Sequence, residues 1–167
     1  DEIFVHAAAD FMRYLAEPLE KLARTHTSGQ ADLLEELFDV FLRFYRQDPP
    51  AFGLSLYLFQ REMLRSLPEQ LRLILDEAGS RNFRGLATIA RMGLNEGYFK
   101  PADPRTLAEM LFSAFLGIVH LENSKSAMGR KNHLEVTADL ALHALREGVI
   151  HPDHAAGFIP AESTSRL

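Results

Sequence analysis

The chain has 167 residues, of which 47% are hydrophobic, with 18 basic and 23 acidic side chains and no cysteine. This length fits one domain, and the lack of cysteine excludes disulfides, thiolate nucleophiles and cysteine zinc sites. The net charge of −5 argues against nucleic-acid binding by this chain alone, because neutralising phosphates requires a basic face. With no signal peptide and no apolar run of about 20 residues, we expect a soluble, cytoplasmic domain without membrane contact.

The first predicted element is a helix over residues 1 to about 24, where apolar residues recur at spacings of three, four and seven. Pro18 lies inside this pattern, and we expect it to kink the helix or divide it. Residues 25–30 include Ser28 and Gly29 and form the first clear loop.

A second helix is predicted over residues 31–48, with apolar residues on more than one face, so it should be covered on two sides. Asp48-Pro49-Pro50 ends it, because the residue before proline is pushed out of the helical region, and proline suits the first turn of the next helix. Residues 51–64 fit both a strand and a helix pattern. We predict a helix, because a lone strand among helices would have no ladder partner.

A long helix opens at Pro68, carries its expected bend at Gly79-Ser80, and ends with Gly97 as the C-terminal cap. The next helix starts at Asp103-Pro104, with aspartate at the N-cap and proline at the first helical position. It is expected to run to about residue 123.

The last predicted helix is capped by Asn132 and ends at Gly148. We therefore predict an all-α fold of about six helices, with one domain over residues 1–148. Residues 149–167 contain two prolines, one glycine and a Ser-Thr-Ser run, and we expect a loosely ordered tail there.

Catalytic and metal-binding motifs are largely missing. The stretch from Gly53 to Tyr57 lacks the second glycine of a nucleophile elbow, and no glutamate is followed by histidine three residues later, as a di-iron bundle requires. His151 and His154 have metal-compatible spacing but no further ligand nearby. We expect no enzyme activity, no metal and no cofactor.

Twelve phenylalanines and no tryptophan are the most informative positive feature. They fit an ordinary packed core, and they also fit an apolar ligand cavity, since such cavities are lined mainly by aromatic and aliphatic side chains. For His120, in an apolar run, a buried structural histidine and a polar ligand anchor are both open. The expected lining of a cavity is Phe11, Phe38, Phe41, Phe59, Met63, Phe83, Met92 and Phe115, with Tyr14, Tyr45, Gln60 and His120 as polar contacts.

Small residues three or four apart in the helix after Asp103 allow another helix to approach closely. The final helix carries two opposite apolar stripes and therefore needs two partners. We predict a homodimer through these two helices, with a closed monomer as the alternative. The expected interface residues are Ser113, Ala114, Gly117, Leu121, Leu134, Ala138, Ala141 and Leu145.

Residues 95–108, which read NEGYFKPADPRTLA, together with Phe115-Leu116-Gly117, resemble the C-terminal domain of TetR/AcrR-family transcriptional regulators. The first four residues, DEIF, resemble the stretch that follows the helix-turn-helix domain of that family. The resemblance extends to residue 148. The family's N-terminal helix-turn-helix itself is absent from this sequence.

The resemblance implies the effector-sensing and dimerisation domain of a DNA-binding regulator, and a repressor is what we expect. It implies a homodimer whose last two helices form a four-helix interface, and a small apolar or aromatic effector. DNA would be bound only through an N-terminal domain, whose spacing in the dimer changes when the effector displaces the first helix. An adaptor module without a pocket, or a helical carrier or enzyme for an apolar molecule, remain alternatives. A cavity of several hundred cubic ångströms would argue against the adaptor.

Overall fold

The computed structural model describes residues 2–27 and 32–155, and its regular elements in these ranges are helices. The predicted all-α fold is confirmed, although two short helices bring the count in the described residues to eight instead of about six. The helices are α1 (Glu2–Thr25), α2 (Leu33–Gln47), α3 (Pro49–Leu58), α4 (Arg61–Ser66), α5 (Glu69–Asn95), α6 (Pro104–Ala127), α7 (Leu134–Val149) and α8 (Pro152–Ala155).

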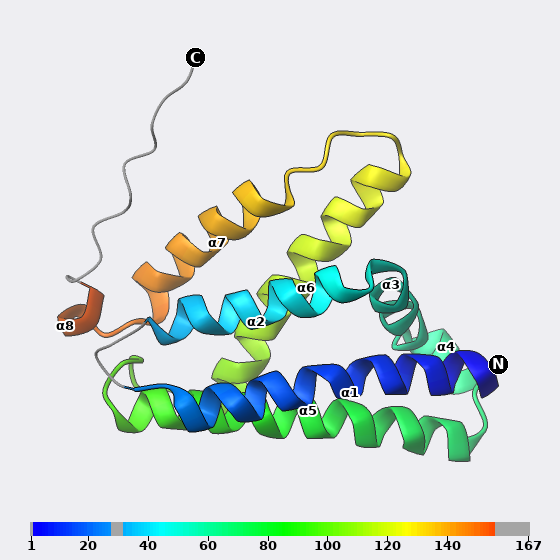
Figure 1. Ribbon diagram of the computed structural model, residues 1–167, viewed down its shortest axis with the longest axis horizontal. Coiled ribbons are helices and arrows are strands. Elements are labelled where there is room, and N and C mark those ends of the chain that lie inside the picture. Colours follow the sequence, from blue (N-terminus) through cyan, green and yellow to red (C-terminus); the bar gives the residue numbers. More distant parts are fainter. Residues whose placement is uncertain (1, 28–31, 156–167) are drawn as a thin grey trace.

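Helices α1 and α5 lie side by side in the same direction and form one side of the bundle (Figure 1). Helices α2 and α3 pack on α1, and α6 packs on α5. Helix α7 returns antiparallel to α6 and also meets α2 (Figure 1). In the described ranges, no helix is both long and apolar enough to span a bilayer.

The buried apolar side chains form a large cluster and a smaller one at the N-terminal end of α1. Helix α2 contributes one broad face to the large cluster, with Leu33 and Phe41 fully buried and Val40 buried as well. Asp39 and Arg43 on the opposite face are exposed, so the expected cover on two sides is not confirmed. The small cluster joins Val5 and Met12 of α1 to residues of α3, of α5 and of the α4–α5 connection.

Helix α1 continues through Pro18, so of the two expected effects of this proline the division of the helix is wrong. Proline removes one main-chain hydrogen bond, which would cost most if the freed carbonyl of Tyr14 were buried. Pro18 lies on the exposed face of α1, whereas Leu15 and Leu19 on either side of it are fully buried. Packing of the buried face therefore holds the two halves in one helix, and water can reach the freed carbonyl.

The single helix expected over residues 51–64 is wrong in one respect, because it is broken between α3 and α4. Gln60 has an extended backbone, with φ −65° and ψ 141°, and precedes α4. Phe52 of α3 is buried in the large cluster and Leu58 of α3 in the small one, and Met63 and Leu64 of α4 also pack against the small cluster.

The caps of the later helices follow their local sequence signals. Gly97 has a positive φ of 71° directly after α5, and the side chain of Asp103 accepts the amide hydrogen of Thr106 at 2.8 Å, as an N-cap does. Helix α5 runs unbroken through Gly79-Ser80. Helix α6 extends about a turn beyond the expected end, to Ala127.

The start of α7 and the chain after it differ slightly from expectation. The N-cap residue is His133, although Asn132 does accept the amide hydrogen of Leu134 through its side chain. After α7, Ile150 is buried and forms an isolated bridge with Phe99. The packed part therefore extends past residue 148, and residues 156–167 of the expected tail lie outside the described ranges.

Candidate ligand-binding site

An apolar cavity of about 270 Å³ lies between α1, α2, α3, α5 and α6. Each of these helices contributes to its wall, and among the described residues no charged side chain lines it. The lining consists of Met12, Leu15, Phe44, Phe52, Ser55, Leu56, Phe59, Gly79, Asn82, Phe83, Phe112 and Leu116. A concave, mainly aromatic and aliphatic surface with few polar groups is typical of sites for small organic molecules.

Aromatic contacts hold the cavity wall in place. The rings of Phe44 and Phe52 meet edge to face with centroids 5.7 Å apart, and those of Phe83 and Phe112 do so at 5.8 Å. Behind the wall, Phe11 stacks on Phe44 at 4.5 Å. These pairs join α1, α2 and α3 on one side of the cavity and α5 and α6 on the other, in geometries that aromatic rings prefer.

Asn82 is the notable polar residue of the cavity wall. It is buried, with 5% exposed, and only one of the two polar atoms of its side chain has a hydrogen-bond partner among the described residues. Its amide Nδ2 donates a hydrogen bond to the main-chain oxygen of Met12 at 2.9 Å. Its carbonyl Oδ1 is buried and has no hydrogen-bond partner among the described residues. The orientation of the amide is fixed, since the oxygen of Met12 can only accept. Ser55, by contrast, donates to the main-chain oxygen of Ala51.

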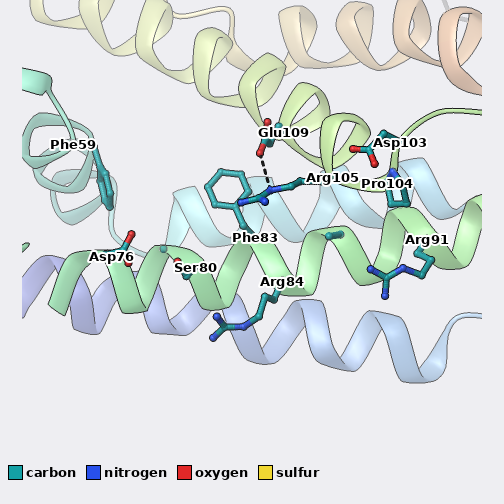
Figure 2. A pocket seen from close by; sticks show the side chains of 12 residues that line it. Phe59, Asp76, Ser80, Phe83, Arg84, Arg91, Asp103, Pro104, Arg105 and Glu109 are labelled. Atoms are coloured by element: carbon teal, nitrogen blue, oxygen red, sulfur yellow. Dashed lines mark ion pairs between the residues drawn. The ribbon is translucent and has the colours of Figure 1, made fainter. Parts of the chain in front are cut away.

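A second, more polar groove of about 630 Å³ lies outside the cavity, between α5 and the start of α6 (Figure 2). Phe59, Gly79 and Phe83 line both spaces. Figure 2 shows Phe83 pointing from α5 toward α6 and Phe59 on the neighbouring turn after α3. Because Phe59 and Phe83 line both spaces, their rings form the boundary between the apolar cavity and the groove. The two residues are 40% and 38% exposed, respectively.

The groove carries the charges that the cavity lacks. Arg84 and Arg91 come from α5, and Arg105 forms an ion pair with Glu109 on α6, with Nε and Oε1 3.4 Å apart (Figure 2). A third hollow of about 560 Å³ lies between α3 and α6 and shares Leu56 and Leu116 with the cavity. The cavity therefore borders two depressions that are more open to solvent than the cavity itself, namely the groove and this hollow.

The predicted ligand contacts are distributed over several places. Phe59 and Phe83 line the cavity, Gln60 and His120 line the hollow between α3 and α6, and Met92 borders a shallow depression near the end of α5. The remaining predicted contacts do not line the cavity. Phe11, Phe38, Phe41, Tyr45 and Phe115 are buried in the large cluster, Met63 packs on the small cluster, and Tyr14 is 58% exposed.

Several residues of the cavity were not identified from the sequence, above all Asn82. A signal for it exists, because Asn82 occupies one position of the buried stripe of α5 that otherwise holds Ala78, Leu86 and Ile89. A single asparagine at such a position is unusual, since buried polar groups need partners. Phe44 has no comparable signal, because its neighbours Phe41 and Tyr45 are equally aromatic.

The predicted interface residues also divide into two groups. Leu134 and Ala138 are buried within the chain, and Ala114, Ala141 and Leu145 are half-buried, whereas Ser113, Gly117 and Leu121 are exposed. The opposite stripe of α7 is the exposed one, with Val136 and Leu140 each 69% exposed. Leu121 of α6 is 55% exposed, and we refer to these three exposed residues of the neighbouring helices α6 and α7 as the α6–α7 face.

The segment that resembles the known family has a structural role. The hydroxyl of Tyr98 donates to Oδ1 of Asp32 at 2.8 Å and accepts the amide hydrogen of Leu34 at 3.2 Å. Asp32 also pairs with Arg146. Burial raises the pKa of Tyr98 well above its ordinary value of 10.0, so it stays a hydrogen-bond donor. This network ties the start of α2 to the ends of α5 and α7.

The described residues thus form an all-α bundle with an apolar cavity, and they contain no cluster of three potential metal ligands. No family model and no curated protein sequence matches the chain. Its fold is similar to that of a protein with unknown function from Rhodococcus sp. RHA1, with a TM-score of 0.68 and 17% identity over 89% of this chain and 73% of that chain.

The fold is also similar to that of SmeT, the repressor of the Stenotrophomonas maltophilia multidrug efflux pump SmeDEF. The TM-score is 0.61 and the identity 17%, over 99% of this chain and 75% of the SmeT chain. The chain therefore has a TetR-like fold.

Proposed function

We propose that this chain is the effector-sensing and dimerisation domain of a TetR-type transcriptional regulator, and that it acts as a repressor. The apolar cavity among five helices of a TetR-like fold carries this proposal. A small apolar or aromatic molecule bound there would change the affinity of the regulator for DNA, which a separate N-terminal domain would bind.

The cavity favours this function over the alternatives. An adaptor module would fill its core completely, and a space of about 270 Å³ among the helices speaks against that. An enzyme would need a polar catalytic pair, whereas Ser55 and Asn82 are the only polar side chains among the described residues that line the cavity.

Helix α1 is the element that would transmit the signal. Met12 and Leu15 line the cavity from its middle, and near its start Ile3 and Phe4 are exposed apolar residues. We propose that these two side chains contact the DNA-binding domain. The proposed regulator would exist in two conformations, one that binds DNA and one that does not. A ligand shifts the equilibrium between them only by its difference in affinity for the two conformations, and a shift from roughly 1:99 to 99:1 takes about 5.5 kcal/mol.

The proposal also includes a homodimer through the α6–α7 face. Leu121, Val136 and Leu140 expose a large apolar surface on two neighbouring helices. Two copies of this face would pair α6 and α7 into a four-helix arrangement and remove these side chains from water.

Binding of the neutral fluorophore N-phenyl-1-naphthylamine tests the site. Leu116→Trp fills the cavity, and the matched variant Leu73→Trp changes an exposed leucine of α5 that lies outside it. We expect the wild type and Leu73→Trp to enhance the fluorescence and Leu116→Trp to lose the enhancement. Native mass spectrometry of the purified chain should show a dimer. Equal binding by all three proteins, or by none, contradicts the proposed site, and a monomer contradicts the proposed assembly.

A further inference from the structure

We infer that the apolar cavity and the outer groove act as one site for an amphipathic carboxylate, with its apolar body in the cavity and its charged end in the groove beside Arg84 and Arg91. This inference rests on the proposed function, because it names the chemical class of the effector for the same cavity. Three observations carry it: the two spaces share a boundary, the cavity is uncharged, and the groove holds arginines without an ion-pair partner.

The cavity and the groove meet at a boundary that three residues form. Phe59, Gly79 and Phe83 line both spaces. The two phenylalanines are partly exposed, and Gly79, one turn before Phe83 on α5, contributes no side chain. A ligand longer than the cavity would pass this boundary and place its end in the groove. The hollow between α3 and α6 also borders the cavity, but no lysine or arginine among the described residues lines it.

The cavity suits the apolar body of such a ligand. No charged side chain among the described residues lines it, and the rings of Phe44, Phe52 and Phe112 belong to its wall. An apolar cavity of about 150 Å³ is enough for benzene, so about 270 Å³ holds a body of about ten carbon atoms. A carboxylate moved into this space would lose its hydration and gain no counter-ion. The charged end therefore belongs outside the cavity.

The groove supplies the counter-charge. Arg84 directly follows Phe83 of the boundary, and Arg91 lies two turns further along the same side of α5. Figure 2 shows both arginines at the groove. Neither guanidinium group has an ion-pair partner among the described residues. Guanidinium groups bind carboxylates through charge-assisted hydrogen bonds, so these two are suited to receive the charged end.

The acidic side chains of the groove are mostly engaged elsewhere. Asp103 accepts the amide hydrogen of Thr106 as the N-cap of α6, and Glu109 pairs with Arg105. Asp76 is left, as one carboxylate against two arginines. Among the described residues, the lining groups without a partner thus carry a net positive charge, in a chain whose net charge is −5. This favours an anionic end over a cationic one.

A matched set of probes tests the inference. The molecules 5-phenylpentanoate, 5-phenylpentanamide and 5-phenylpentylamine share a phenyl ring and a methylene chain, and end in a negative, a neutral and a positive group. We expect NMR titration of the wild-type chain to give a dissociation constant about fivefold lower for the carboxylate than for the amide, since partly exposed charge pairs contribute modestly. The amine should bind no better than the amide. Raising the salt from about 0.02 M to about 0.3 M should narrow the difference, because exposed charges are screened.

Benzoate and benzamide test whether the two spaces act as one site. In benzoate the carboxylate is attached directly to the ring, so it cannot reach the arginines of the groove while the ring lies in the cavity. Benzoate should therefore bind no better than benzamide. An equal preference for the carboxylate in this short pair would show that the groove binds anions without the cavity, which overturns the inference.

Variants of the two arginines assign the preference to the groove. Arg84→Gln combined with Arg91→Gln removes both charges, so 5-phenylpentanoate and 5-phenylpentanamide should bind equally. The matched control combines Arg65→Gln with Arg72→Gln, which removes two arginines outside the groove and changes the net charge by the same amount. This control should keep the preference. All four side chains are exposed, and circular dichroism checks that both variants keep the fold.

The possible outcomes separate this inference from the proposed function. Equal binding of 5-phenylpentanoate and its amide by the wild type overturns the inference and leaves a ligand cavity in place. Tighter binding of the amine, or a carboxylate preference that persists without Arg84 and Arg91, also overturns it. Failure of the wild type to bind all of these probes and the fluorophore overturns the proposed ligand site as well.

Discussion

Nδ2 of Asn82 donates a hydrogen bond to the main-chain oxygen of Met12 over 2.9 Å, which ties the middle of α5 to α1 at the wall of the cavity. The other end of the same amide is the carbonyl that lacks a partner. Met12 and Asn82 both line the cavity, so a molecule bound there would contact α1 and α5 at the point where this bond joins them. In the proposed regulator, this contact would connect the ligand to the helix nearest the DNA-binding domain.

The half-satisfied state of Asn82 predicts an unusual stability order. Asn82→Leu loses the bond to Met12 but also removes the unmet carbonyl, so we expect a change in the free energy of unfolding of less than about 1 kcal/mol. Asn82→Asp places a carboxylate in an uncharged wall, and we expect a loss of about 3 kcal/mol or more at neutral pH. Urea unfolding monitored by circular dichroism measures both. Both variants lose the bond to Met12, so a larger loss for leucine than for aspartate would contradict this order.

A close approach between α5 and the segment after it predicts that Gly93→Ala is destabilising. A Cβ at Gly93 would lie 2.6 Å from ring atoms of Phe99, which is buried and cannot swing into solvent, and 2.9 Å from Leu33. Overpacking of this kind costs about 1–3 kcal/mol, more than alanine gains as a helix former. Thermal unfolding should show the loss. Gly53→Ala meets open space in α3 and should be neutral or stabilising; equal effects of the two would refute the packing argument.

The carboxylate of Glu122 makes the α6–α7 connection sensitive to acid. Oε2 of Glu122 accepts the amide hydrogen of His133 at 2.7 Å, and Lys125 pairs with the same carboxylate. These contacts, the His133 bond first, lower the pKa of Glu122 below its ordinary value of 4.5. Because the folded-state pKa is the lower one, the stabilisation is full above the unfolded-state pKa and is lost as the pH falls through the folded-state pKa.

Glu122→Gln tests this dependence, because glutamine keeps an acceptor for His133 but carries no charge. In urea unfolding, the difference in stability between wild type and Glu122→Gln should be largest near neutral pH and should close as the pH falls through the lowered folded-state pKa of Glu122. Glu135→Gln removes an exposed partner of Arg46 and should have little effect at any pH. A difference for Glu122→Gln that does not vary with pH would exclude the charge as its cause.

The sequence predicts those parts of the fold that depend on local signals. Asp48-Pro49 and Asp103-Pro104 begin helices, and Gly97 ends one, because capping and φ restraints act within a few residues. The break between α3 and α4 has no such signal, since no proline or glycine lies at residues 59 and 60.

The candidate site is harder to predict for the same reason. Phe41 and Phe44 are one turn apart on the apolar face of α2, and both belong to the large cluster. Phe44 also lines the cavity whereas Phe41 does not, and this difference depends on how α1, α3 and α6 close around α2. A pattern of apolar residues indicates burial, but it does not say which buried face borders an open space.

The α6–α7 face leads to a prediction about assembly. Leu140 is 69% exposed at the centre of the apolar stripe of α7, and a charge there would have to be buried if two copies met on this face. We expect size-exclusion chromatography with light scattering to give twice the chain mass of 18.8 kDa for wild type and the single mass for Leu140→Glu. Leu73→Glu, at an exposed leucine of α5, should remain a dimer.

This experiment decides which of the two apolar stripes of α7 forms the interface. The sequence pattern predicts the interface on Leu134 and Ala138, but both side chains are already buried against their own chain and have little surface left to offer a partner. Ala138→Glu should therefore unfold the chain, whereas Leu140→Glu should leave a folded monomer by circular dichroism. If Leu140→Glu stays dimeric, the interface lies on another surface. If the wild type itself is monomeric, the exposed stripe has a different partner.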